Sequence, residues 1–138
     1  MGLGRVLVVD DDLYIRQTLR LVLTKAGYDV AEAEDGEKGV AAIQKSDGDA
    51  LLVDVIICDL IMPKMNGTEA ITYFRSQFPS VPVIVMTGTP DLIKAKKLTM
   101  EQGVMDYLVK PVRPAELLAA VRKAALQKAV KGHIFFAT

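Results

Sequence analysis

The sequence predicts an α/β protein with one parallel sheet covered by helices on both faces. Short apolar runs, typical of buried strands, alternate with segments whose apolar residues recur at helical spacing. This alternation occurs five times in succession, which favours βα units and a parallel sheet. The chain has 138 residues, 51% hydrophobic and 25% charged, which suits a single globular domain with a substantial core.

The five predicted strands are apolar runs bounded by polar or turn-forming residues. The second, YDVAEA, is more polar than the others and is expected nearer a sheet edge. In chain order, the predicted strands cover residues 5–10, 28–33, 54–59, 81–87 and 104–110.

The segments between the strands have the periodicity of amphipathic helices. The first is predicted from Leu13 to Ala26, and Gly27 stands where a helix stop is expected. The fourth is predicted to open with Thr89 as N-cap and Pro90 at the first helical position. Residues 46–54 are left open between helix and loop. The other predicted helices cover residues 36–45, 68–78 and 114–131.

The order of the strands follows from the preferences of such folds. Right-handed crossovers and a small doubly wound sheet predict the order 2-1-3-4-5, with the first and third strands side by side at the topological switch point. We expect residues 5–128 to form the domain and residues 129–138 to be a C-terminal tail or a truncated linker.

The charge balance and the scarcity of cysteine and histidine argue against several classes of function. Seventeen basic residues balance seventeen acidic ones, so no global positive field favours direct binding of nucleic acid or a membrane surface. A single cysteine, Cys58, and a single histidine, His133, disfavour a disulfide framework and Ser-His-Asp catalysis. There is no signal-peptide pattern and no apolar stretch long enough to span a bilayer, so a cytoplasmic location is expected.

Chemically active side chains stand at the carboxyl ends of four predicted strands. The first strand runs into Asp10, Asp11 and Asp12, the third ends in Asp59, the fourth in Thr87 and the fifth in Lys110. Ligands of open parallel sheets bind in the crevice beyond these ends, so we expect three or four carboxylates, a hydroxyl group and an ammonium group to converge on one site.

The aspartates of this constellation predict a metal site. Two carboxylates about 5 Å apart repel each other by roughly 3 kcal/mol at an effective dielectric near 20. A divalent cation relieves this repulsion, and Mg²⁺ fits best because it binds one or two carboxylates and leaves room for water and phosphate oxygens. The neighbouring Asp12 is interpreted as the N-cap of the first helix.

Asp59 has a second predicted role, as the nucleophile that forms an aspartyl phosphate. Phosphoryl transfer depends mostly on positioning and on positive charge around the phosphoryl oxygens. Mg²⁺, the ammonium group of Lys110 and the hydroxyl group of Thr87 supply these, and no histidine base is needed.

Four sequence blocks, in this order, resemble the receiver domain of two-component response regulators. They are VLVVDDD, VIICDLIMPKMNG, PVIVMTG and DYLVKP. The resemblance covers essentially residues 5–128 and implies a flavodoxin-like receiver fold. It also implies a signalling switch, rather than an enzyme with a separate substrate, that catalyses only its own phosphorylation and dephosphorylation. The phosphodonor would be a sensor histidine kinase or a phosphotransfer protein.

The resemblance also implies a role for each site residue. Asp59 is the implied phosphoacceptor, Lys110 contacts its phosphoryl group, Thr87 moves toward that group and Tyr107 changes rotamer. This alters the surface of the fourth helix, fifth strand and fifth helix, which would control an output domain or partner or a phosphorylation-dependent dimer. The implied Mg²⁺ ligands are Asp10, Asp11, Asp59 and, through its backbone carbonyl, Ile61.

Three rival interpretations use the same residues differently. A haloacid-dehalogenase-type phosphatase would use Asp10 as nucleophile and Asp12 as acid, but its D-x-D-x-[TV] pattern is broken by Tyr14. A flavin-binding protein would need a hydroxyl- and glycine-rich phosphate loop after the first strand, where three acids stand. An inactive docking receiver would have no need of the complete set of acids, threonine and lysine.

Overall fold

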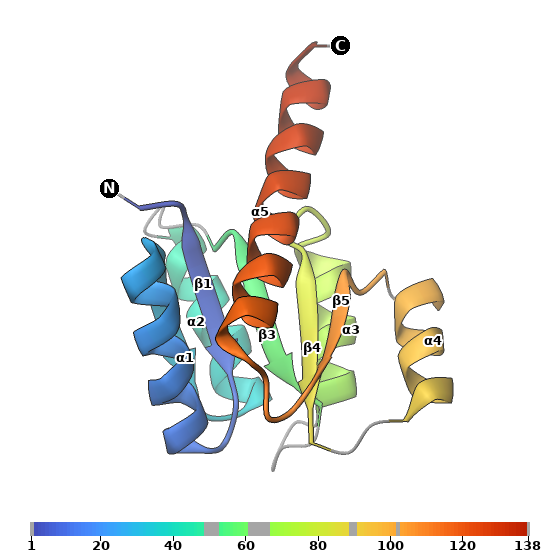
Figure 1. Cartoon of the computed structure of the whole chain (residues 1–138). Coiled ribbons are helices and arrows are strands. Elements are labelled where there is room, and N and C mark those ends of the chain that lie inside the picture. The colour runs from blue at the N-terminus through green and yellow to red at the C-terminus, as the bar shows by residue number, and fades with distance from the viewer. Residues whose placement is uncertain (1, 49–52, 61–66, 89–90, 102, 138) are drawn as a thin grey trace.

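The computed structural model confirms the predicted fold, with five parallel strands in one sheet in the order β2-β1-β3-β4-β5 and helices on both faces (Figure 1). It describes residues 2–48, 53–60, 67–88, 91–101 and 103–137. The strands are β1 (Arg5–Val9), β2 (Asp29–Ala33), β3 (Val55–Asp59), β4 (Val83–Thr87) and β5 (Asp106–Val109). The helices are α1 (Leu13–Ala26), α2 (Gly36–Gly48), α3 (Gly67–Gln77), α4 (Leu92–Glu101) and α5 (Pro114–Ala137).

Side chains from each strand alternate between two buried clusters, one on each face of the sheet. Val6 and Val8 of β1 face the cluster formed with α1 and α5, whereas Leu7 and Val9 face the cluster formed with α2, α3 and α4. Such two-sided burial explains why β1, β3 and β4 are continuous apolar runs. The more polar β2 lies at one edge of the sheet, as predicted.

Helix α1 has the predicted limits, because both of its ends carry strong local signals. The Asp12 carboxylate accepts hydrogen bonds from the backbone N–H groups of Tyr14 (2.8 Å) and Ile15 (3.3 Å), so Asp12 is the N-cap, as interpreted from the sequence. At the other end Gly27 has φ = 108°, a left-handed conformation that favours glycine and ends the helix.

The helices α4 and α5 differ from their predicted limits. The predicted N-cap Thr89 and the following Pro90 lie outside the described residues. The described helix α4 begins at Leu92, and the Asp91 carboxylate accepts hydrogen bonds from the backbone N–H groups of Ile93 and Lys94, each at 3.1 Å.

The predicted end of α5 at Lys131 is wrong, because the helix continues to Ala137 and extends beyond the sheet (Figure 1). The helix continues through Gly132, because glycine in a helix interior costs only about 1 kcal/mol relative to alanine.

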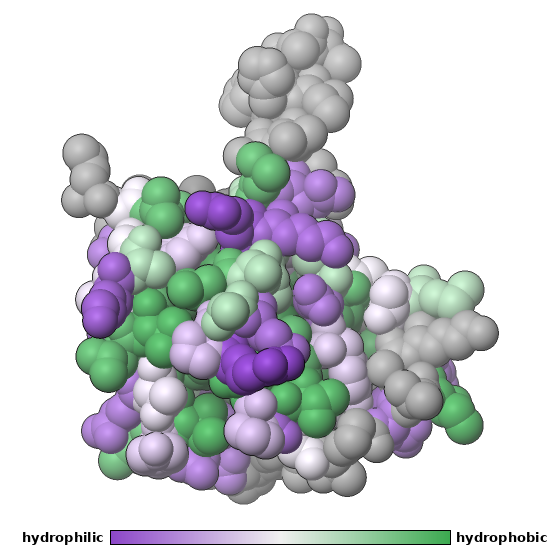
Figure 2. All heavy atoms as spheres, in the orientation of Figure 1, coloured by the Kyte–Doolittle hydropathy of each residue, from purple (hydrophilic) through white to green (hydrophobic). Residues whose placement is uncertain are grey.

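The α1 and α5 face of the molecule mixes hydrophilic and apolar residues (Figure 2). Its exposed apolar residues include Leu21 of α1 and Leu126 of α5. Among the described residues, none of the helices is both long enough and apolar enough to cross a membrane.

Candidate functional site

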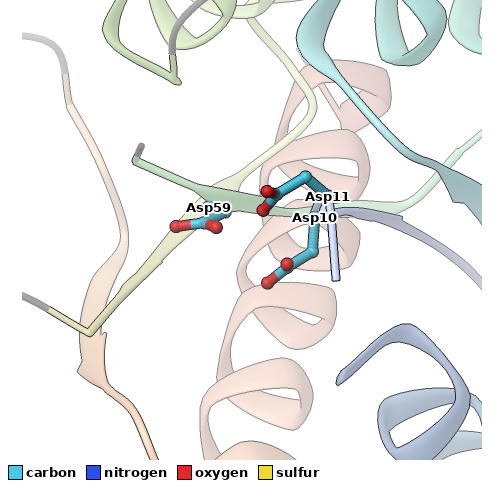
Figure 3. Close-up of side chains that lie close together, drawn as sticks. All are labelled: Asp10, Asp11 and Asp59. Atoms are coloured by element: carbon cyan, nitrogen blue, oxygen red, sulfur yellow. The ribbon is translucent and has the colours of Figure 1, made fainter. Parts of the chain in front are cut away.

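The carboxyl ends of β1 and β3 bring three aspartates together. Val9 and Cys58 are partners in the pairing of β1 with β3, so the next residues along the two strands, Asp10 and Asp59, are neighbours. The carboxylates of Asp10, Asp11 and Asp59 gather in one small region (Figure 3), and one oxygen of each lies within 4.8 Å of the other two. Asp10 and Asp59 are buried, whereas Asp11 is exposed.

Lys110 completes this group, which we call the acid site (Asp10, Asp11, Asp59 and Lys110). Its Nζ lies 2.8 Å from Asp10 Oδ2 and 3.1 Å from Asp59 Oδ2. The Lys110 N–H group also donates a 2.8 Å hydrogen bond to the Thr87 carbonyl, which extends the β4–β5 ladder by one residue. The three strands β1, β3 and β5 therefore all supply charged groups to one place, as their end residues led us to expect.

The charges within the acid site shift the pKa of Lys110 upward. Burial favours the neutral amine and lowers this pKa, but the ion pairs with Asp10 and Asp59 outweigh burial and hold the pKa above its usual value. Lys110 is therefore a cation at neutral pH. A single ammonium faces three carboxylates, so the site keeps an excess of negative charge.

The donor set of the acid site fits Mg²⁺. All three candidate side-chain donors are carboxylate oxygens, the type of ligand that this ion prefers. Among the described residues, the buried Asp10 Oδ2 accepts no hydrogen bond, although the Lys110 ammonium lies 2.8 Å from it, while Asp10 Oδ1 accepts a 2.9 Å hydrogen bond from the Asp12 N–H group. The fourth predicted ligand, the backbone carbonyl of Ile61, lies outside the described residues.

Thr87 and Tyr107, which we call the switch pair after the role predicted for them from the sequence, come from the neighbouring strands β4 and β5. Thr87 is fully buried at the end of β4, two residues after Val85, which packs in the cluster with α2, α3 and α4. Tyr107 is the register partner of Val85 and packs against the same cluster. Its hydroxyl oxygen is buried and has no hydrogen-bond partner in the described part of the chain.

Sequence reasoning missed a contact between α1 and the acid site. The Arg16 Nη1 group donates a 2.7 Å hydrogen bond to the backbone carbonyl of Asp10, and Arg16 Nε donates a 3.1 Å hydrogen bond to Glu32 of β2. The helical periodicity of α1 does not indicate this contact, and Arg16 was assigned no role from the sequence. Its position four residues after the Asp12 cap was the available signal, because a long side chain there can reach back to the preceding loop.

The comparisons with known proteins agree with this geometry. Residues 6–122 match the response regulator receiver domain family. A response regulator receiver domain from Clostridium thermocellum has 31% sequence identity and a TM-score of 0.81, with 92% of this chain and 98% of that chain covered. The chemotaxis protein CheY4 of Vibrio cholerae has 36% identity and a TM-score of 0.78, with 88% and 98% covered.

A curated relative extends this likeness to larger regulators. The DNA-binding response regulator MtrA of Mycobacterium tuberculosis is 36% identical over 118 residues, which are 86% of this chain and 49% of MtrA. The chain thus spans about half the length of the curated relatives it matches. Nothing found supports the phosphatase alternative, and Asp12, its proposed acid, caps α1 instead. By family match, fold and acid site together, the chain belongs to the receiver domains of two-component response regulators.

Proposed function

We propose that Asp59 is the phosphoacceptor of this receiver domain and that its phosphorylation is the switching event. The observation that carries the proposal is the surroundings of its carboxylate. Asp59 is 4% exposed, Lys110 Nζ lies 3.1 Å from it, and oxygens of Asp10 and Asp11 lie within 4.8 Å. A buried carboxylate at a strand end with cationic help is suited to nucleophilic attack on phosphorus.

The proposed reaction requires no base. A carboxylate oxygen of Asp59 forms a bond to the phosphorus while the bond between the phosphorus and the donor histidine nitrogen breaks. The electron pair of the broken P–N bond stays on the histidine nitrogen. Lys110 balances negative charge on the phosphoryl oxygens. Asp10, Asp11 and Asp59 would hold Mg²⁺, together with the predicted Ile61 carbonyl, and bound Mg²⁺ supplies further positive charge to these oxygens.

The proposed response passes through the switch pair. A phosphoryl group on Asp59 adds acceptor oxygens, and the Thr87 hydroxyl donates a hydrogen bond to one of them. Tyr107, on the adjacent strand, then changes rotamer into the space that Thr87 vacates. The surface of α4, β5 and α5 changes with it, and this surface would bind the output domain or protein, or a second phosphorylated copy.

The partners follow from the same reaction. A sensor histidine kinase or a phosphotransfer protein would be the donor, and transfer would occur in the cytoplasm. The proposed receiver unit is residues 5–128, followed by residues 129–138 as a tail or linker. The receiver catalyses only changes in its own phosphorylation, and contacts with nucleic acid, if made by the larger regulator, would come from another domain.

Acetyl phosphate tests the proposal directly. With Mg²⁺, the wild-type chain should gain one acid-labile phosphoryl group, detected by intact mass, and Asp59→Asn should gain none. Asp29→Asn is the matched control, because this exposed residue begins β2 at the opposite end of the sheet. Modification that persists in Asp59→Asn but is lost in Asp10→Asn would overturn the assignment in favour of a phosphatase nucleophile.

A further inference from the structure

Arg16 joins three parts of the molecule that lie around the acid site. It is the fourth residue of α1, and its own N–H group donates a 3.0 Å hydrogen bond to the carbonyl of the cap residue Asp12. Its side chain, only 12% exposed, turns back to the Asp10 carbonyl at 2.7 Å and across to Glu32 of β2 at 3.1 Å. The guanidinium group therefore ties the loop between β1 and α1 to both the helix and the sheet edge.

The hydrogen bond from Arg16 to the Asp10 carbonyl restrains the orientation of the next residue, Asp11. A peptide unit is planar, so a fixed Asp10 carbonyl also fixes the N–H group and the Cα atom of Asp11. The Asp10 N–H group is held on the other side by a 3.1 Å hydrogen bond to the Ala33 carbonyl. Asp11 is exposed, and its carboxylate has no hydrogen bond or ion pair with the other described residues, so its orientation depends on this backbone.

The arrangement of charges favours a geometric role for Arg16. Glu32 forms ion pairs with both Arg16 and Arg20, so the positive charge of Arg16 is largely balanced outside the acid site. Burial raises the pKa of Glu32, but the hydrogen bonds and charges of Arg20 and Arg16 outweigh burial and lower it overall. Glu32 therefore stays ionised at neutral pH and keeps the guanidinium group in its bridging position.

We propose that Arg16 is a positioning residue for the metal site: by holding the Asp10–Asp11 peptide, it sets the Asp11 carboxylate for Mg²⁺ binding. The inference rests on the proposed function of the acid site, and it adds a residue that touches neither the phosphoryl group nor the ion. Groups that orient metal ligands from behind commonly change metal affinity by 10–100-fold when removed.

Arg20 offers a matched control on the same helix. It lies one turn further along α1 and pairs with the same Glu32, but its side chain is 46% exposed and makes no contact with Asp10 among the described residues. Arg20→Ala therefore removes one of the two ion pairs of Glu32 and leaves both contacts of Arg16, including its hydrogen bond to the loop. Arg16→Lys keeps the charge, but a single ammonium group cannot reproduce the fork that reaches both Asp10 and Glu32.

The experiment measures Mg²⁺ affinity by calorimetry and, in Mg²⁺-free protein, the backbone amide resonances of Asp11 and Asp12. For Arg16→Ala we expect a Kd for Mg²⁺ about 10-fold higher than in the wild type and displaced resonances. Arg16→Lys should be intermediate, and Arg20→Ala should stay within about twofold. Phosphorylation by acetyl phosphate should need more Mg²⁺ in Arg16→Ala but recover to within about threefold of the wild-type rate at saturation.

The readouts separate this inference from the function on which it rests. A wild-type chain that binds no Mg²⁺ would overturn the proposed metal site itself. If the wild type binds Mg²⁺ but Arg16→Ala keeps its affinity and its two amide resonances, Arg16 does not position Asp11. Equal losses of Mg²⁺ affinity in Arg16→Ala and Arg20→Ala would also overturn the inference. Each variant removes one ion pair with Glu32, so equal losses would be explained by the ion pairs and not by the hydrogen bond from Arg16 to Asp10. If Arg16→Ala does not fold, the Mg²⁺ affinity and the two amide resonances of Arg16→Lys are compared with those of Arg20→Ala. Larger changes in Arg16→Lys support the inference, and equal or smaller changes overturn it.

Discussion

In the acid site, the buried carboxylates lie beside an ammonium group, whereas at Tyr107 a hydroxyl group is buried without a hydrogen bond to any other described residue. Lys110 lies within 3.1 Å of both Asp10 and Asp59. Tyr107 lies on β5, the strand that also leads to Lys110, and its hydroxyl group is buried with no hydrogen bond in the described part of the chain. Asp10 Oδ2 also lacks a hydrogen bond there, but the Lys110 ammonium group lies 2.8 Å from it, whereas the Tyr107 hydroxyl group has no such ion pair.

The comparison shows how one small domain can hold both the groups proposed to react, in the acid site, and the groups proposed to respond, in the switch pair. In the proposed function, the groups that would react are already held in place by the strand ends before a phosphoryl group arrives, which is the preorganisation that phosphoryl transfer requires. An unsatisfied hydroxyl costs free energy in its present position, so Tyr107 has less to lose on moving than a fully bonded side chain would. Replacements at Lys110, at Tyr107 and at Glu32 would test this comparison.

Replacing Lys110 should damage the acid site most. In Lys110→Met we expect the rate of phosphorylation by acetyl phosphate to fall by about 100-fold, the usual cost of removing one donor to developing charge. Mg²⁺ should nevertheless bind several-fold more tightly, because the competing ammonium group is gone. Rates and calorimetric affinities measure the two effects, and Lys97→Met, which removes an exposed lysine of α4, is the control. A parallel loss of Mg²⁺ affinity would show that Lys110 supports the fold of the site instead.

Replacing Tyr107 tests the other half of the comparison. Tyr107→Phe removes the unpartnered hydroxyl group and should stabilise the unphosphorylated protein by about 0.5–1 kcal/mol, because a buried hydroxyl without a hydrogen bond is unfavourable. Urea unfolding measures the change. Tyr14→Phe is the control, because Tyr14 is 73% exposed and its replacement should leave stability unchanged. Destabilisation of Tyr107→Phe would mean that the hydroxyl is hydrogen-bonded in solution and that the contrast between the two regions is wrong.

The same contrast separates what the sequence could predict from what it could not. The fold followed from strong periodic patterns, and the acid site followed from the rule that parallel strands end at one edge. Asp10, Asp59 and Lys110 could be assigned to one place because each directly follows or ends an apolar strand. The limits of α1 were equally accessible, since Asp12 and Gly27 are specific capping signals.

The features that escaped prediction depend on side-chain directions or on weak local preferences. The described helix α4 begins after Asp91, whose carboxylate accepts hydrogen bonds from its first turn, while the predicted cap Thr89 lies outside the described residues. The length of α5 was underestimated because a glycine is only a modest helix breaker. The bridge from Arg16 to Asp10 joins residues six apart through a loop, and no periodicity indicates such a contact.

A further expected effect is a pH dependence of the stability contributed by Glu32, the ion-pair partner of Arg16, with no such dependence at Tyr107. The pKa of Glu32 is lowered in the folded protein: burial opposes the shift, but Arg20 and Arg16 outweigh it. Its stabilising contribution is therefore present above the unfolded pKa, near 4.5, and is lost as the pH falls through the lower folded pKa. Glu32→Gln should cost about 0.5–1 kcal/mol at pH 7, the modest value typical of partly exposed ion pairs.

Urea unfolding of the wild type and of Glu32→Gln between pH 7 and pH 3 measures this contribution. The difference between their free energies of unfolding should shrink toward zero as the pH falls. Glu101→Gln, an exposed position at the end of α4, should show no such difference at any pH. Tyr107→Phe should keep its stability difference over the whole range, because neither phenol nor phenyl titrates there. A Glu32→Gln difference that persisted at pH 3 would show that Glu32 stabilises the fold through packing, and that its charge does not hold Arg16 beside the acid site.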